Sequence, residues 1–249
     1  MAAYYDSFDY PEYWRGREYE HQSEILALKS LLSQVPQINR LIDIGAGYGR
    51  LTPIYLHRAK KIVLTDPSSK LLNIAKKPLK NKNIVYLQSK VENLNQKLTK
   101  KSFDLAIMVR VLHHLQDIDL CFETVNNLLD KNGYFILEFA NKKHIKAIIY
   151  EFIKGNLTFP LEIFPKNLIT KKIRPCLPFF NYHPGDIYKK LADNNFRIIK
   201  KISVSNIRSA LIKKILPLDV LIYLEKYFQN HISSLDIGPS IFVLSQKKG

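Results

Sequence analysis

The ten residues LIDIGAGYGR, Leu41–Arg50, constrain the fold of this 249-residue chain more than any other stretch. An apolar run of strand length leads into three glycines, Gly45, Gly47 and Gly49, and a helical stretch follows. Glycine lets the backbone turn tightly and approach a ligand closely, and a helix N-terminus offers unpaired N–H groups. A strand, a glycine loop and a helix in this order are typical of a nucleotide-binding loop in an α/β fold.

The spacing of the glycines limits the class of ligand that the loop is expected to bind. Dinucleotide-binding loops use GxGxxG, whereas this loop has GxGxG. A phosphate-binding P-loop ends in Lys-Ser/Thr, and Arg50 and Leu51 stand there instead. Asp43, two residues before Gly45, places a negative charge that disfavours pyrophosphate and favours an ammonium or sulfonium group. The alternative is a tight strand-to-helix turn that binds nothing.

Strands and helices alternate through the first 140 residues. The runs RLIDI, KIVLTD, NIVYLQ, FDLAIMV and GYFILEFA are apolar and of strand length, with helical stretches between them. This pattern predicts a doubly wound, mostly parallel α/β sheet covered on both faces. A proline- and aromatic-rich stretch, residues 156–185, predicts an irregular insertion or cap. A helix, a strand, a helical stretch broken at Pro217 and a closing strand are expected after it.

The second strand supplies another candidate ligand-binding residue, Asp66, at the end of KIVLTD. A carboxylate in this place accepts hydrogen bonds from ribose hydroxyls. Its alternative role is to cap the helix that follows. Because Ser68 serves equally well as that cap, we expect Asp66 to face a ligand.

Together these stretches resemble class I S-adenosylmethionine (SAM)-dependent methyltransferases, in particular the small-molecule, type 11 group. LIDIGAGYGR resembles the first family motif, VLTDPSSKLL the second, and YLQSKVENL the stretch beside the adenine. SFDLAIMVRVLHHL and NNLLDKNGYFILEF resemble the fourth- and fifth-strand motifs. The resemblance covers roughly residues 40–141. It implies a Rossmann-like, seven-stranded sheet in the order 3-2-1-4-5-7-6 with the last strand antiparallel, SAM as cofactor and S-adenosylhomocysteine as product.

The resemblance also assigns the cofactor contacts. Asp43 and the three loop glycines are expected beside the amino acid and ribose parts of SAM, and Asp66 at the ribose. Lys90, Val91 and Glu92 fall where the family contacts adenine. The family often has an acid at the position of Lys90, and lysine cannot accept a hydrogen bond. We therefore expect the Val91 N–H, with help from Glu92, to meet the ring.

The division of the chain follows from the same comparison. One methyltransferase domain is expected over 1–249. It is made of an aromatic N-terminal lid (1–36), a cofactor-binding half (37–141), a substrate-cap insertion (142–185) and the rest of the sheet (186–249). In the lid, Tyr13, Trp14 and Arg17 are predicted to cover the cofactor, with Arg17 near its methionine carboxylate. The alternative is that these aromatic residues pack on the core.

Candidate catalytic residues follow the fourth strand. Methyl transfer from a sulfonium requires an acceptor held in line, and a general base only where the acceptor must lose a proton. Arg110 is a candidate anchor for an acidic acceptor group, or else a surface residue. His113 and His114 are candidate bases or structural residues, and adjacent helix residues point apart, so at most one of them is expected to face the site. No metal site is expected, because no third ligand lies nearby in sequence.

The charge of the chain bears on its partners. Residues 1–140 carry 19 Lys+Arg against 15 Asp+Glu, a net +4, and residues 141–249 carry 19 against 7, a net +12. A basic half suits nucleic acid, a lipid surface or a phosphorylated substrate, although lysines on solvated faces are the simpler explanation.

Three functions remain open on this sequence. The aromatic insertion favours a small organic acceptor with an apolar or aromatic part, methylated at O, N or C. The alternatives are an RNA-modifying methyltransferase that uses the basic half, and a non-catalytic SAM-fold binding protein.

The compartment is predicted from cysteine usage and targeting signals. Cys121 and Cys176 lie far apart without a CxxC motif, which favours a reducing cytoplasm. The first residues lack the pattern of a signal peptide, and no run approaches the roughly 18 apolar residues of a membrane span. The sequence leaves the oligomeric state open.

Overall fold

A seven-stranded sheet forms the centre of the computed structural model, which describes residues 10–79, 83–115, 117–167 and 179–249. Its strands are β1 (Ile38–Ile44), β2 (Ala59–Asp66), β3 (Ile84–Gln88), β4 (Phe103–Met108), β5 (Leu129–Ala140), β8 (Phe196–Val204) and β9 (Ser240–Lys247). They lie in the order β3-β2-β1-β4-β5-β9-β8. Because β8 and β9 are the sixth and seventh strands of this sheet, the predicted order is confirmed. The two-residue strands β6 (Lys166–Asn167) and β7 (Phe180–Asn181) pair separately.

Strand direction determines which loops meet. β1 pairs in parallel with β2 and β4, β2 with β3, and β4 with β5. β9 is antiparallel to both β5 and β8, as predicted for the last strand. The carboxyl ends of β1–β5 and of β8 therefore lie at one edge of the sheet, which we call the carboxyl edge. In open α/β sheets this is the edge at which ligands bind.

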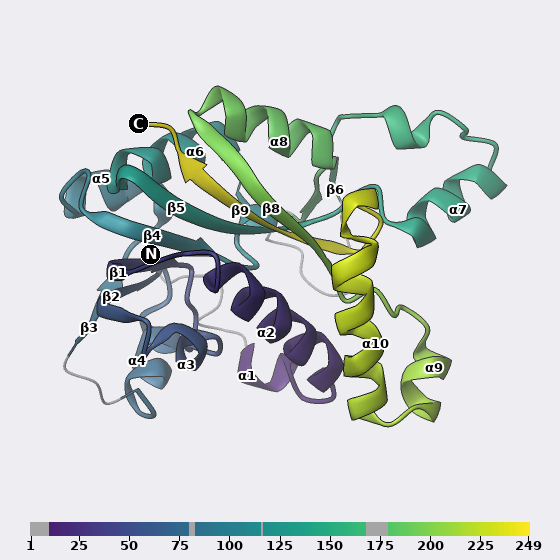
Figure 1. Cartoon of the computed structure of the whole chain (residues 1–249), viewed down its shortest axis with the longest axis horizontal. Coiled ribbons are helices and arrows are strands. Elements are labelled where there is room, and N and C mark those ends of the chain that lie inside the picture. The colour runs from purple at the N-terminus through teal and green to yellow at the C-terminus, as the bar shows by residue number, and fades with distance from the viewer. Residues whose placement is uncertain (1–9, 80–82, 116, 168–178) are drawn as a thin grey trace.

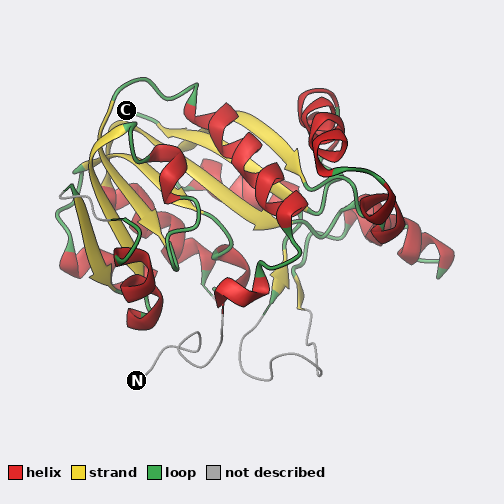
Figure 2. Ribbon diagram, turned by 90° about the horizontal axis from the view of Figure 1, so that it is seen from below, coloured by secondary structure: helices red, strands yellow, loops and turns green. Residues whose placement is uncertain are grey.

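Helices cover both faces of the sheet (Figures 1 and 2). One face carries α5 (Leu94–Lys97), α6 (Ile118–Leu128) and α8 (Pro184–Asp193), and the other carries α2 (Glu18–Leu32), α3 (Thr52–Tyr55) and α4 (Ser69–Lys76). Successive strand residues point to opposite faces, so Ile42 packs in the first layer and Leu41 in the second. This two-sided burial explains why the strands are apolar along most of their length.

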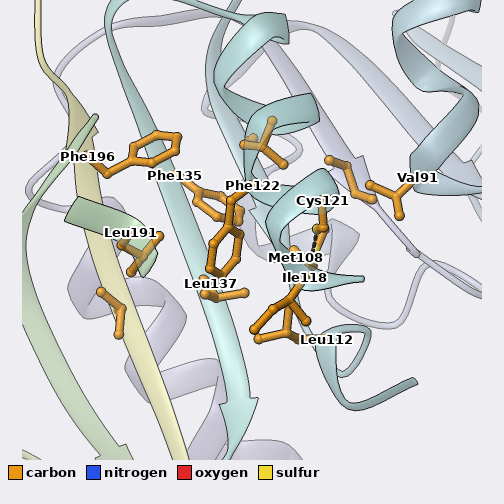
Figure 3. Packing of buried hydrophobic residues seen from close by; sticks show 14 of the residues in the cluster. Val91, Met108, Leu112, Ile118, Cys121, Phe122, Phe135, Leu137, Leu191 and Phe196 are labelled. Carbon is orange, nitrogen blue, oxygen red and sulfur yellow. Dashed lines mark hydrogen bonds between the residues drawn. The ribbon is translucent and has the colours of Figure 1, made fainter. Parts of the chain in front are cut away.

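Three aromatic side chains pack in a row within the first layer (Figure 3). Phe122 of α6 lies edge-on to Phe135 of β5 at 6.2 Å between ring centroids, and Phe135 lies 5.6 Å from Phe196 of β8. All three are buried. The free thiol of Cys121 lies beside Met108, with 3.8 Å between the sulfurs. The contacts join the fifth strand to the end of the sheet.

The segments beyond the cofactor-binding half are also helical where the pattern predicted helices. These are α7 (Ile145–Ile153), α9 (Ala210–Ile215) and α10 (Leu218–His231), with the break at Pro217 as expected. Shorter elements are α1 (Tyr10–Tyr13) and the 3₁₀ turns η2 (Val91–Asn93), η3 (Leu112–His114), η4 (Phe159–Leu161) and η5 (Ser233–Leu235). No helix in the described ranges is long and apolar enough to cross a membrane.

A buried carboxylate joins the N-terminal helix to the C-terminal one. Glu225 of α10 accepts the hydroxyl proton of Tyr19 in α2 at 2.5 Å and the N–H groups of Ser205 and Asn206 at 2.8 and 3.0 Å. The Tyr19 hydroxyl in turn accepts the Ile207 N–H at 2.9 Å. Burial and the adjacent carboxylate raise the pKa of Tyr19, so its proton stays on the hydroxyl. The network holds α2, α10 and the loop after β8 together.

We expect Tyr19→Phe to lower the free energy of unfolding by about 1–3 kcal/mol, because the Ile207 N–H and one Glu225 oxygen lose a buried partner. Urea denaturation measures the change. Tyr223→Phe is the control, since Tyr223 lies on α10 with 74% of its surface exposed. Equal stability of the two variants would contradict a structural role for this network.

Candidate active site

A cavity of about 750 Å³ opens at the carboxyl edge of the sheet. Its walls come from the loops that follow β1, β2, β3 and β4, and from Tyr10 of α1. A smaller pocket of about 40 Å³ adjoins it and shares Tyr10, Gly45, Gly47 and Arg110. Asp43 lines this smaller pocket. The glycine loop thus lies between the two spaces.

The loop glycines differ in what they require. Gly45 has a φ of 75°, and a Cβ there would lie 2.2 Å from a methyl carbon of Val111. A Cβ on Gly49 would lie 2.8 Å from Leu79, so that position serves packing against the segment after α4. A Cβ on Gly47 would meet nothing closer than Leu71 and Tyr10, both at 3.9 Å. Gly47, Leu71 and Tyr10 all line the cavity. Of the three loop glycines, therefore, only Gly47 keeps space open for a ligand.

Asp66 ends β2 and lines the cavity with 5% of its surface exposed. Its carboxylate accepts the N–H of Gly47 at 2.9 Å and the N–H of Ser68 at 2.8 Å. Ser68 caps α4 by accepting the Leu71 N–H at 3.1 Å, so the helix does not depend on Asp66 for its cap. A carboxylate accepts more hydrogen bonds than two. Asp66 therefore orients the glycine loop and lines the cavity.

Asp43 is buried beside this loop and receives a short hydrogen bond from the Tyr55 hydroxyl. Burial raises the pKa of Asp43 to about 7; the Tyr55 hydrogen bond and the charge of Arg50 oppose the rise, and the charge of Asp66 adds to it. Its proton is therefore exchanged near neutral pH. A cation bound next to Asp43 would favour the ionised carboxylate.

A second buried acid, Glu24 of α2, was not predicted to belong to the site. Its carboxylate binds the guanidinium of Arg110 at 2.6 Å and makes a short bond to that of Arg50. Burial alone would raise the pKa of Glu24, but these two cations hold it below its ordinary value. The Trp14 ring lies against both guanidiniums, 3.5 Å from Arg50 and 4.7 Å from Arg110. One signal was present in the sequence: Glu24 interrupts the apolar face of a helix.

Arg110 lines both cavities, as its position after β4 predicted. Its backbone adopts a φ of 61°, unusual for a residue with a side chain. The Arg110 N–H donates to buried Glu138 at 2.7 Å, and Glu138 also binds Ser240. The guanidinium is thus held by Glu24 within the protein. It is not the surface residue of the alternative interpretation.

The two histidines occupy different environments. His114 lines the cavity, whereas His113 is buried, 5% exposed, with its ring 4.4 Å from Phe179. Their rings lie 4.0 Å apart, and Phe179 packs against both, so the expectation that the adjacent side chains point apart was wrong. Burial lowers the pKa of His113 well below its usual range. A neutral, packed His113 is a structural residue, and His114 is the one that reaches the site.

The adenine-side residues lie together. The loop after β3 contains Lys90, Val91 and Glu92. All three line the cavity, which the glycine loop after β1 also lines. Arg17 does not: it is exposed, stacks on the Tyr13 ring at 4.3 Å and is absent from the cavity walls. Trp14 is buried against Arg50 and Arg110 and does not line the cavity, whereas Tyr10 does. The other N-terminal aromatic residues of the predicted lid, at positions 4, 5 and 8, lie outside the described residues.

The described residues of the predicted substrate cap, 142–185, do not line the cavity. Phe159 is buried within the insertion, and Phe164 is exposed. Neither these nor any other described residue of 142–185 lines the cavity. Phe179 contacts the two histidines, and residues 168–178 are outside the description. The role of the insertion as a cap stays a prediction.

Within the described ranges, no group of three or more His, Cys, Asp or Glu side chains is placed to hold a metal.

Comparison with known proteins adds relatives for this arrangement. Residues 42–137 match a family model described as a methyltransferase domain. The chain is 30% identical over 114 residues to the ubiquinone biosynthesis O-methyltransferase of Pelagibacter ubique, which covers 46% of this chain and 47% of that protein. The chain thus spans about half the length of this relative. It is 23% identical over 219 residues to the tRNA 5-carboxymethoxyuridine methyltransferase of Escherichia coli, covering 85% of this chain and 81% of that one.

A solved structure extends the similarity to the whole fold. The S-adenosylmethionine-dependent methyltransferase from Mesorhizobium loti superposes with a TM-score of 0.61 at 20% identity, over 90% of this chain and 98% of that one. The strand order, the glycine loop between two pockets and the matched family model agree on one assignment. Residues 42–137 carry a methyltransferase domain, and the strand order is that of the class I S-adenosylmethionine-dependent methyltransferases; both findings support SAM as the cofactor.

Proposed function

We propose that this protein transfers the methyl group of SAM to a small organic acceptor that has an apolar or ring-shaped part, at O, N or C. The observation that carries the proposal is the cavity at the carboxyl edge. It joins the glycine loop and Asp66 to a wall of Val109, Val111 and Leu115. This apolar part of an otherwise mixed lining suits the apolar or ring-shaped part of a small ligand.

The residues present fit the cofactor. Asp66 would accept hydrogen bonds from the ribose, and the Val91 backbone with Lys90 and Glu92 would border the adenine. Asp43 would face the positive charge of the cofactor. Arg50 and Arg110 bring two positive charges against the one of ionised Glu24. We assign the methionine carboxylate to these two arginines, because Arg17 lies outside the cavity walls.

Methyl transfer needs little further chemistry from the chain. SAM supplies an activated methyl group when bound. The protein must hold the acceptor in line and exclude water. His114 is the titratable side chain at the cavity next to the apolar wall, so it is our candidate base for an acceptor that loses a proton.

An RNA-modifying activity is the second candidate. The similarity to the tRNA methyltransferase covers more of this chain than the similarity to the quinone-pathway enzyme does, although at lower identity. The basic half, residues 141–249, is compatible with it. Incubation with methyl-labelled SAM and either phenolic acceptors or total tRNA separates the two. Label in the small-molecule fraction supports our proposal, and label confined to tRNA overturns it.

Asp66→Ala should weaken SAM binding by about 1–3 kcal/mol, the usual cost of losing a charged acceptor. Titration calorimetry measures the affinity. Asp104→Ala is a matched control, because Asp104 also accepts two backbone N–H bonds, at 2.8 and 2.7 Å, at the opposite edge of the sheet. If both variants bind SAM as the wild type does, Asp66 is no more than a structural acid.

Gly47→Val should abolish SAM binding, because the new side chain would occupy the space between Leu71 and Tyr10. Gly155→Val is the control for backbone strain. Gly155 also has positive φ, 86°, and a Cβ there meets no atom within 4 Å. Retained binding by the Gly47 variant, again by calorimetry, would remove the loop from the cofactor site.

SAM affinity should fall as the pH is lowered from about 7.5 to about 5.5, by on the order of tenfold. The sign follows from the raised pKa of Asp43, about 7 in the free protein. Below that value the carboxyl is protonated, and the cofactor's positive charge must displace the proton. Asp43→Asn should bind more weakly with a flat pH profile. A wild-type affinity constant over this range would contradict the proposed charge contact.

A further inference from the structure

Two helical segments leave the carboxyl edge and carry exposed apolar side chains. The α7–η4 hairpin, residues 145–164, follows β5, and α9 follows β8. Figure 1 shows α7 and α9 at the same end of the molecule. Arg208, before α9, is close enough to His144, before α7, to lower the pKa of that histidine, though less than burial does. The two segments therefore start near each other at this end of the molecule.

The hairpin exposes an unusual amount of apolar surface. Nine large hydrophobic side chains between Ile145 and Phe164 are exposed, among them Ile153 at 81%, Leu161 at 78% and Phe164 at 78%. α7 buries none of its residues. In α9, Leu211 and Ile215 are 66% and 67% exposed. Single exposed hydrophobic residues are common, but a set of this size on one hairpin is typical of an interaction surface.

The hairpin is held in place from its base. Lys142, 5% exposed, donates to the carbonyl oxygens of Glu162 and Phe164 at 2.9 and 3.0 Å. The His183 ring contacts the Pro160 carbonyl oxygen at 3.0 Å. Next to His183, the Tyr182 hydroxyl donates to the carbonyl of cavity residue Leu115 at 3.3 Å. The apolar surface is thus ordered and connected to the cavity wall.

The charge around the hairpin is positive. Residues 142–167 contain five lysines and two glutamates, a net +3. Both glutamates are already paired, Glu151 with Lys166 at 2.8 Å and Glu162 with Lys142 at 3.3 Å. Across the described ranges, the ion pairs do not include Lys143, Lys146 or Lys154.

We propose that the α7–η4 hairpin and α9 dock the protein on an anionic lipid bilayer surface, with the carboxyl edge turned toward the lipid. Exposed Ile, Phe and Leu beside lysines match the boundary between acyl chains and acidic headgroups. Protein interfaces, by contrast, are depleted in lysine. If the proposed methyltransferase function holds, the acceptor reaches the cavity from the membrane and is an amphiphile with a lipid-soluble part. The docking itself does not depend on that function.

Co-sedimentation of the full chain with vesicles tests the docking. We expect binding to vesicles of phosphatidylcholine with phosphatidylglycerol, and at least about tenfold weaker binding to phosphatidylcholine alone or at about 0.5 M salt. I149S/F152S/I153S should lose at least about tenfold in binding, since it removes apolar surface that enters the lipid. K146E/K154E should lose the preference for anionic vesicles.

Two controls separate docking from a general loss of apolar surface or of folding. V85S/I199S removes exposed apolar side chains of β3 and β8, 58% and 41% exposed, and should bind vesicles as the wild type does. SAM calorimetry on every variant reports folding and the cofactor site separately from docking. No binding of the wild type to either vesicle, or unchanged binding of the triple variant, overturns the proposal. The proposal is also overturned if sedimentation equilibrium shows that the wild type is a dimer, that the triple variant is a monomer, and that neither binds vesicles. The surface would then join two copies of the chain.

Discussion

The buried carboxylate of Glu24 is the contact on which the arrangement of the site depends. A charge removed from water must be paired, and Glu24 is paired with two arginines that come from different loops. Arg50 follows the glycine loop and Arg110 follows β4, so one helix side chain fixes the distance between them. Trp14 closes over both guanidiniums. The described start of the N-terminal segment is thereby placed against the cofactor loop, and its role as a lid stays a prediction.

The parallel sheet explains why these groups meet at all. Asp43, Asp66 and the residues after β3 and β4 are far apart in sequence, yet they end adjacent strands that run in one direction. The same rule brings the α7–η4 hairpin and α9 to this edge, because β5 and β8 also end there. The cofactor cavity and the proposed lipid-docking surface lie at the same edge of the sheet for one topological reason. A lipid-soluble acceptor would therefore need no long path through water.

The elements that were predicted well are those with strong local patterns. Continuous apolar runs gave the strands, and the helix break followed Pro217. The loop motif located Gly47 and Asp66 at the cavity. Predictions failed or stayed open where a contact depended on distant residues. Arg17 lies away from the cavity, Arg50 and Glu24 were overlooked, and the rings of His113 and His114 meet with Phe179 packed against both.

The sequence by itself determined the alternation of strands and helices and the loop that suits SAM, because periodicity and glycine spacing are local properties of the chain; the strand order followed from the family resemblance. Only the tertiary structure decided which glycine keeps the cavity open, which arginines stand at it and which hydrophobic residues remain exposed. Those outcomes depend on neighbours such as Val111 beside Gly45 or Glu24 beside Arg110, which lie tens of residues away. Burial and charge pairing are properties of the packed chain, and the linear pattern does not contain them.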